Sequence, residues 1–218
     1  MKIVLILLGF ALISTTNIYA QKEIKPKLSK IESLFKKGEL IEAKEISDVS
    51  ISYEKTMDNP KTWYLRGLIY MALDTSASMV GVTNDALKTS ISSFIKSDAL
   101  IEDKSNELFI ADDYGYPTTK TQQIESYWGF YYNKAATAFG EKDFVEAITS
   151  FNNAALIKPN DTNSVINAGY AAVQAKMYDQ AKNSFYKAIE LGSTDKDVRL
   201  ILIYVCLLYT SPSPRDVE

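Results

Sequence analysis

The sequence predicts an all-α chain in which antiparallel helix pairs stack into an elongated array. The main observation is an internal register of 34 residues, which relates the segment 140–161 to the segment 176–195. Glycine and proline are scarce, with 9 and 6 among 218 residues, and this disfavours the many tight turns of a β-sandwich. A hydrophobic content of 46% is sufficient for a core that extends along such an array.

Residues that lie 34 positions apart in this register match in size. Small residues recur where two helices must approach closely, and aromatic residues recur one turn later on the same helix face. The matched pairs are Ala135 and Gly169, Ala138 and Ala172, Phe144 and Tyr178, Ala147 and Ala181, Phe151 and Phe185, Ala154 and Ala188, and Ile157 and Leu191. Pro159 follows the apolar run of the first copy, and it ends that helix. We therefore expect the matched alanines and phenylalanines to be buried between helices.

This order of small, aromatic, small and proline residues resembles the tetratricopeptide repeat (TPR). Two positions depart from the family pattern, because Lys142 stands where a turn glycine is usual and Ser193 replaces the terminal proline. The resemblance covers residues 28–204 and is clearest over 128–195. It implies a TPR-like α-solenoid, a right-handed superhelix whose concave face is lined by the first helix of each pair.

Upstream of the clear repeats the pattern is weaker. The segment 35–46 resembles the turn and second helix of a repeat, while 59–73 and 85–102 resemble the two helices of the next one. An insertion at 103–121 then precedes a helix expected at about 122–139, and we expect no β-sheet in the array. The predicted organisation is a signal peptide (1–20), divergent TPR-like helix pairs (21–102), an insertion loop (103–121), a TPR array that is incomplete in its last repeat (122–205), and an adapter-derived segment (206–218).

The N-terminal segment MKIVLILLGFALISTTNIYA has the three parts of a secretory signal peptide. Lys2 is followed by an apolar stretch, and small polar residues lead to Ala20. The apolar stretch is shorter than the roughly 20 residues that span a membrane. The junction of Ala20 and Gln21 resembles signal peptides of Bacteroidetes bacteria. We therefore predict cleavage after Ala20 and a periplasmic or secreted protein, with an uncleaved anchor as the alternative.

The C-terminal segment CLLYTSPSPRD, at 206–216, interrupts a pattern that begins another first helix at about residue 196. One choice of codons for these residues spells the end of a transposase-type sequencing-library adapter, read in frame. A natural terminus rich in proline and serine is the alternative. We predict that residues 206–218 derive from the adapter and that the natural repeats continue past Val205.

The sequence lacks residues on which several kinds of active site depend. The chain has no histidine, and its one cysteine, Cys206, lies in the segment predicted to derive from the adapter. A histidine base, a thiolate nucleophile and a His/Cys metal site are therefore not expected. A net charge of −3 is close to balance and does not predict a basic surface for nucleic acid. Asp112 and Asp113 could bind Ca²⁺, but no EF-hand pattern surrounds them, and we interpret this segment as a polar loop. We predict no catalytic residue, no metal, no cofactor and no integral membrane span.

The TPR resemblance implies where a ligand would bind. In the family, ligand-facing residues occupy positions 2, 5, 6, 9 and 12 of each repeat, and position 1 corresponds to Pro60, Trp128 and Thr162 here. The residues implied for the groove are Tyr64, Leu68, Tyr132, Asn133, Asn167 and Tyr170. Asn133 and Asn167 share position 6, where an amide can donate to and accept from a peptide backbone. The tyrosines either anchor a ligand or pack partly in the core. At position 7, we expect Arg66 and Lys134 to be solvated charges.

The predicted function is that of an exported, non-catalytic TPR scaffold that binds a protein or peptide through its concave groove. Association with the cell envelope is compatible with export. The alternative is that the chain is the N-terminal repeat module of a longer enzyme, or of a cell-wall or glycan-binding protein, whose C-terminal part is missing.

Overall fold

The structure, a computed structural model, describes residues 25–79, 81–103, 107–112 and 114–210. The predicted signal peptide, and all but the first five residues of the segment 206–218, lie outside the described residues. Within these described ranges, no helix combines the length and the apolar character needed to cross a membrane.

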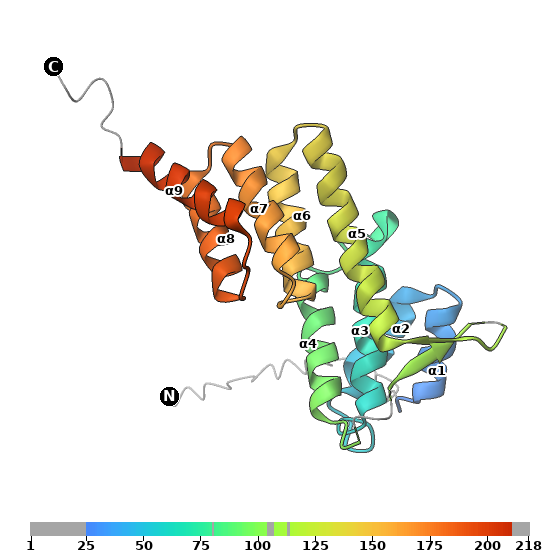
Figure 1. The fold of residues 1–218 in the computed structure, drawn as a ribbon. Coiled ribbons are helices and arrows are strands. Elements are labelled where there is room, and N and C mark those ends of the chain that lie inside the picture. The colour runs from blue at the N-terminus through green and yellow to red at the C-terminus, as the bar shows by residue number, and fades with distance from the viewer. Residues whose placement is uncertain (1–24, 80, 104–106, 113, 211–218) are drawn as a thin grey trace, which may run out of the picture.

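The described chain is an all-α, TPR-like solenoid, as the sequence predicts. Figure 1 shows helices that follow one another in antiparallel pairs, and consecutive helices pack together within each half of the array. In chain order the helices are α1 (Leu28–Lys36), α2 (Leu40–Ser50), α3 (Pro60–Thr75), the short 3₁₀ helix η1 (Ala77–Met79), α4 (Ala86–Ala99), α5 (Lys120–Gly140), α6 (Phe144–Ile157), α7 (Thr162–Gln174), α8 (Tyr178–Glu190) and α9 (Lys196–Thr210). The first helices of the pairs are thus α1, α3, α5 and α7, and α9 follows in the same position.

In three of the pairs, a short turn of the same type connects the two helices. The second residue after the first helix is Gly38 after α1, Lys142 after α5 and Lys176 after α7. Their φ angles are positive, at 75°, 64° and 59°, respectively. This left-handed conformation explains why glycine is usual at this position, because side chains other than glycine adopt it at a cost. The departure at Lys142 therefore leaves the turn unchanged.

Side-chain caps fix where several helices begin. Asn59 accepts a hydrogen bond from the Lys61 backbone and precedes Pro60, the first residue of α3. Asp143 and Asp161 cap α6 and α7 in the same way. Since a cap satisfies backbone N–H groups that lack a partner inside the helix, these residues set the start of each element.

A phenylalanine packed over a small residue joins the two helices of a pair. A Cβ atom on Gly169 of α7 would lie 2.6 Å from Cε1 of Phe185 in α8. A Cβ atom on Gly67 of α3 would lie 2.5 Å from Cε1 of Phe94 in α4. The α3/α4 pair therefore has the same contact as α7/α8, although its connection is longer. The predicted core residues Ala147, Phe151, Ala154, Ala181, Phe185 and Ala188 are all buried, which confirms the register.

The core consists of three clusters of buried residues. One extends through α5 to α9, and another joins α1 to α4. A smaller cluster contains Tyr127, Tyr131, Ala154 and Ile157, and side chains of α3 and α4 pack against it. This third cluster connects the two halves of the array.

Helix α5 begins earlier than the repeat pattern requires. It starts at Lys120, whereas position 1 of its repeat is Trp128. Thr119 and Gln122 form a capping box at this earlier start. The buried Lys120 side chain pairs with Asp98 and donates to the Phe94 carbonyl at the end of α4. The extra turns therefore attach α5 to the preceding pair.

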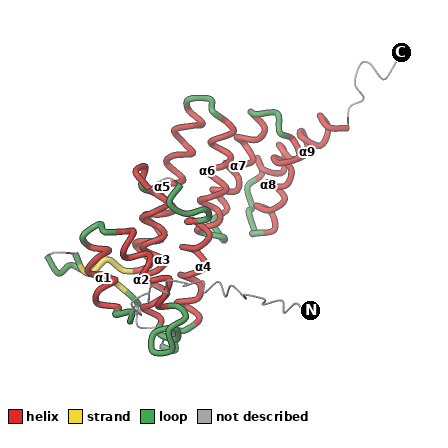
Figure 2. Tube along the Cα trace, turned by 180° about the vertical axis from the view of Figure 1, so that it is seen from behind, coloured by secondary structure: helices red, strands yellow, loops and turns green. Residues whose placement is uncertain are grey.

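The expectation of no β-sheet is wrong at one place. Within the insertion 103–121, β1 (Phe109–Ala111) pairs antiparallel with β2 (Pro117–Thr119), and Figure 2 shows this hairpin beside the α1/α2 pair. Asp112 Oδ1 accepts hydrogen bonds from the Tyr114 and Tyr116 backbones at 2.9 and 2.8 Å, and Gly115 has a φ of 86°. Strands of three residues are too short to show a two-residue periodicity, which explains why the sequence does not reveal them.

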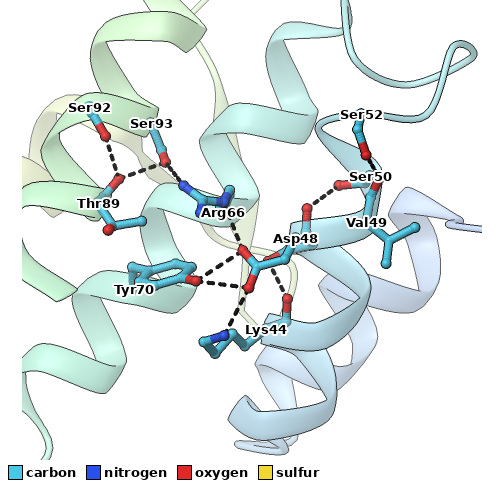
Figure 3. Close-up of polar contacts among 11 residues, drawn as sticks. Lys44, Asp48, Val49, Ser50, Ser52, Arg66, Tyr70, Thr89, Ser92 and Ser93 are labelled. Carbon is cyan, nitrogen blue, oxygen red and sulfur yellow. Dashed lines mark hydrogen bonds and ion pairs between the residues drawn. The ribbon is translucent and has the colours of Figure 1, made fainter. Parts of the chain in front are cut away.

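The prediction that Arg66 is a solvated charge is also wrong. Its side chain is only 14% exposed, and Nε pairs with Asp48 Oδ1 at 3.0 Å while Nη1 donates to Ser93 Oγ at 2.9 Å (Figure 3). Lys44 and Tyr70 bind the same Asp48 carboxylate. Burial and the hydrogen bond to Asp48 raise the pKa of Tyr70. This network ties α2, α3 and α4 together.

Candidate protein-binding face

The predicted ligand residues of the clear repeats lie on two neighbouring first helices. We define the first-helix face as the surface of α5 and α7 that carries Trp128, Tyr132, Asn133, Asn167 and Tyr170. Asn133 is exposed, and Tyr132, Asn167 and Tyr170 are half-buried. All four predicted residues of these repeats therefore reach the surface.

Tyr132 and Asn167 bind each other across the two helices. Asn167 Nδ2 donates to the Tyr132 hydroxyl at 2.7 Å. The Tyr132 ring lies edge-on to Phe151, with centroids 5.3 Å apart, so its base is part of the core. No described residue donates to Asn167 Oδ1, and this amide keeps an acceptor for a ligand. The contact links α5 and α7 at this level of the face.

Trp128 extends the aromatic surface, although the repeat pattern does not place it among the groove residues. Its ring lies 4.7 Å from the Tyr132 ring, between centroids. Its Nε1 donates to Asp161 Oδ2 at 3.1 Å and to Ser164 Oγ at 3.0 Å, both at the start of α7. Lys158 Nζ lies 4.6 Å from the ring centroid. The signal that could have identified Trp128 is its position one turn before Tyr132.

Asn133 on α5 and Tyr170 on α7 complete the first-helix face. Asn133 shares the position of Asn167 one repeat earlier, and its side chain is exposed. The Tyr170 ring contacts Phe185 edge-on, with centroids 5.5 Å apart. Burial, followed by the carboxylates of Asp195 and Asp197, raises the pKa of Tyr170. Its hydroxyl therefore stays protonated at neutral pH and can donate a hydrogen bond.

Tyr64 and Leu68 do not lie on an accessible groove, which corrects the sequence prediction. Both side chains are 0% exposed and belong to the N-terminal core cluster. Ile110 of β1 belongs to the same cluster, so the insertion adds to the core of α3 at this point. The buried Tyr64 hydroxyl has no hydrogen-bond partner among the described residues, and burial raises its pKa. These two side chains cannot contact a ligand unless the core opens.

A second open surface lies between the second helices α6 and α8. It contains a cavity of about 820 Å³ whose lining includes Ile148, Val165 and Leu191. Asn152 and Asn183 also line this cavity, and both are exposed. The repeat pattern predicts no ligand residues on this surface.

The described residues contain no group of three or more His, Cys, Asp or Glu side chains placed to hold a metal ion. Asp112, the described member of the aspartate pair considered for Ca²⁺, instead holds the hairpin turn. Asp113 lies outside the described residues.

Comparison with known proteins supports the repeat assignment. The family model described as tetratricopeptide repeat matches residues 163–192, which comprise nearly all of α7 and all of α8. No curated protein matches the chain. Among solved structures, 24 chains match.

Two of these structures illustrate the match. The structure titled "MamA RS-1 ArsTM double mutant" is 14% identical with a TM-score of 0.36, over 84% of this chain and 84% of that chain. The structure titled "Crystal structure of APC/C hetero-tetramer Cut9-Hcn1" is 14% identical with a TM-score of 0.36, over 82% of this chain and 29% of that chain. The helix pairs and the family match together identify α7 and α8 as a tetratricopeptide repeat within a TPR-like solenoid.

Proposed function

We propose that this protein is an exported scaffold without catalytic activity of its own, which binds a segment of another protein on the first-helix face. The tetratricopeptide match at residues 163–192 supports a protein-interaction role. The face offers aromatic rings and side-chain amides, which suit an extended or helical protein segment.

The observation that carries this proposal is the linked arrangement of Trp128, Tyr132 and Asn167. Hydrogen bonds hold all three side chains before any ligand arrives. A surface that is already ordered loses less side-chain entropy on binding, and more of the contact energy remains as affinity. Aromatic residues that keep a polar group at the surface are typical of protein interfaces.

The amides alone cannot supply the affinity. A hydrogen bond contributes a net of about 0.5–1.5 kcal/mol, so Asn133 and Asn167 mainly select the orientation of the ligand backbone. The greater part of the affinity is assigned to the rings of Trp128, Tyr132 and Tyr170, because buried aromatic residues dominate most interfaces.

A pull-down from the native source tests the face directly. The variant Asn133→Ala/Asn167→Ala/Tyr170→Ala should lose its partner while its circular-dichroism spectrum stays helical. The matched control is Asn152→Ala/Asn183→Ala/Tyr186→Ala, which removes two exposed amides and one half-exposed tyrosine from α6 and α8. This control should keep the partner. If the first variant retains the fold and every partner, the first-helix face is not the binding surface.

Export is the second part of the proposal, and it rests on the signal-peptide pattern of residues 1–20. N-terminal sequencing of the protein from its native source should begin at Gln21. A chain that retains Met1 or Lys2 would contradict export by this route.

A further inference from the structure

A cavity of about 510 Å³ lies where the α3/α4 pair meets the α5/α6 pair. Its apolar lining comes from Leu73, Met79, Leu87 and Leu156. Asp74, at the end of α3, and Tyr131, from α5, also line it. We call it the junction cavity, because residues of both halves of the array enclose it.

Two buried tyrosines orient the Asp74 carboxylate. The hydroxyls of Tyr127 and Tyr131 both donate to Asp74 Oδ2 at 2.6 Å. These tyrosines are only 2% and 7% exposed. No described residue donates a hydrogen bond to Asp74 Oδ1. The carboxylate is thus held in place on one side and keeps free acceptor capacity on the other.

Asp74 also gives the junction cavity its charge. Two other charged side chains line the cavity, Asp85 and Lys88, and they pair with each other at 3.5 Å. Both are largely exposed, at 70% and 76% of their side-chain surface, so water screens them. The cavity therefore combines apolar walls with one uncompensated, half-buried carboxylate.

We propose that the junction cavity accepts an arginine side chain of the partner protein, whose guanidinium group binds Asp74. This inference rests on the proposed scaffold function, which supplies the partner. The aliphatic part of arginine suits the leucine and methionine walls, while the planar head donates several hydrogen bonds to a carboxylate. A divalent metal ion fits less well, because it requires several oxygen ligands, and the described residues hold no such group.

The test uses the full chain and a small probe, so it does not depend on knowing the partner. N-acetyl-arginine amide and N-acetyl-citrulline amide, its uncharged isostere, are titrated against protein with ¹³C-labelled tyrosine rings. Arginine should shift the Tyr131 ring signals, with a dissociation constant on the order of 1 mM. Citrulline should bind about tenfold more weakly, because it lacks the charge that strengthens the hydrogen bonds to Asp74.

Two variants locate the probe. Asp74→Asn should weaken arginine binding about tenfold, whereas Asp85→Asn, which removes the exposed carboxylate of the same cavity, should leave it within about twofold. Equal binding of arginine and citrulline would overturn the proposal. That comparison uses the wild-type chain and decides the matter even if Asp74→Asn does not fold. If arginine fails to bind while the triple variant on α5 and α7 loses the partner, the cavity proposal fails and the scaffold proposal stands.

Discussion

The space over Gly169 is filled by the Phe185 ring, and this contact sets how closely α7 and α8 approach. Gly169→Ala should lower the free energy of unfolding by about 1–3 kcal/mol, because the new methyl group forces the buried ring to move. Gly129→Ala is the matched control, since it lies within α5 with no atom within 4 Å of the new Cβ. That change should raise stability by about 0.4–1 kcal/mol. Urea unfolding measures the free energy of unfolding of both variants. Equal effects of the two changes would show that the Phe185 ring does not restrict the space over Gly169.

Tyr127 and Tyr131 should make the stability of the fold decrease at alkaline pH. Burial, and then the hydrogen bond and negative charge of Asp74, raise the pKa of both hydroxyls above the ordinary value of 10.0. The folded state then keeps protons that the unfolded state releases. This contribution to stability is complete below pH 10 and is lost as the pH rises above it, with a slope of about 1.4 kcal/mol per pH unit for each tyrosine.

Urea unfolding at pH 9 to 11 tests this contribution. Tyr127→Phe/Tyr131→Phe should show a smaller loss of stability with rising pH than the wild type. Tyr186→Phe, at a ring that is 48% exposed, should keep the wild-type dependence. Identical slopes in all three proteins would show that the two tyrosines do not titrate differently on folding.

Single residues also mark the limit of what the sequence can predict. The repeat pattern predicts that Tyr132, Asn133, Asn167 and Tyr170 lie on a surface, and the structure shows them there. The same pattern predicts surface positions for Tyr64 and Leu68, and both are buried. The repeat pattern reflects contacts between neighbouring repeats only. These two side chains are instead buried in a cluster that includes Ile110 from the insertion.

At the scale of single helices, the register between α6 and α8 makes Phe185 a central core residue. Phe185→Ala should lower the free energy of unfolding by about 3–5 kcal/mol, because it leaves a cavity in the buried cluster that extends through α5 to α9. Tyr186→Ala, the neighbouring aromatic residue on the exposed side of α8, should cost less than about 0.5 kcal/mol. Urea unfolding monitored by circular dichroism compares the two. A loss below about 1 kcal/mol for Phe185→Ala would mean that the register is wrong.

The helices of the clear repeats could be predicted because small and aromatic residues recur at a fixed spacing. The hairpin and the early start of α5 could not, for a physical reason. Both depend on contacts that occur once, such as Lys120 with Asp98 and Ile110 with the α3 cluster. A contact that is not repeated leaves no periodic signal in a single sequence.

At the scale of the whole molecule, the two halves of the array meet in a small cluster that contains Tyr127 and Tyr131. In a solenoid each unit contacts only its neighbours, so this junction determines whether the halves unfold together. The junction cavity at Asp74 lies here too, and residues of α3, α4, α5 and α6 line it. Of these helices, α5 also carries part of the first-helix face.

The central claim is that a partner binds the first-helix face and not the surface of the second helices. Site-specific photo-crosslinking in the native source tests it most directly, with a photoreactive amino acid placed at Asn133 on α5 or at Asn183 on α8, both exposed. We predict a partner crosslink from position 133 and none from position 183. A crosslink from position 183 alone would contradict it and assign binding to the groove between α6 and α8.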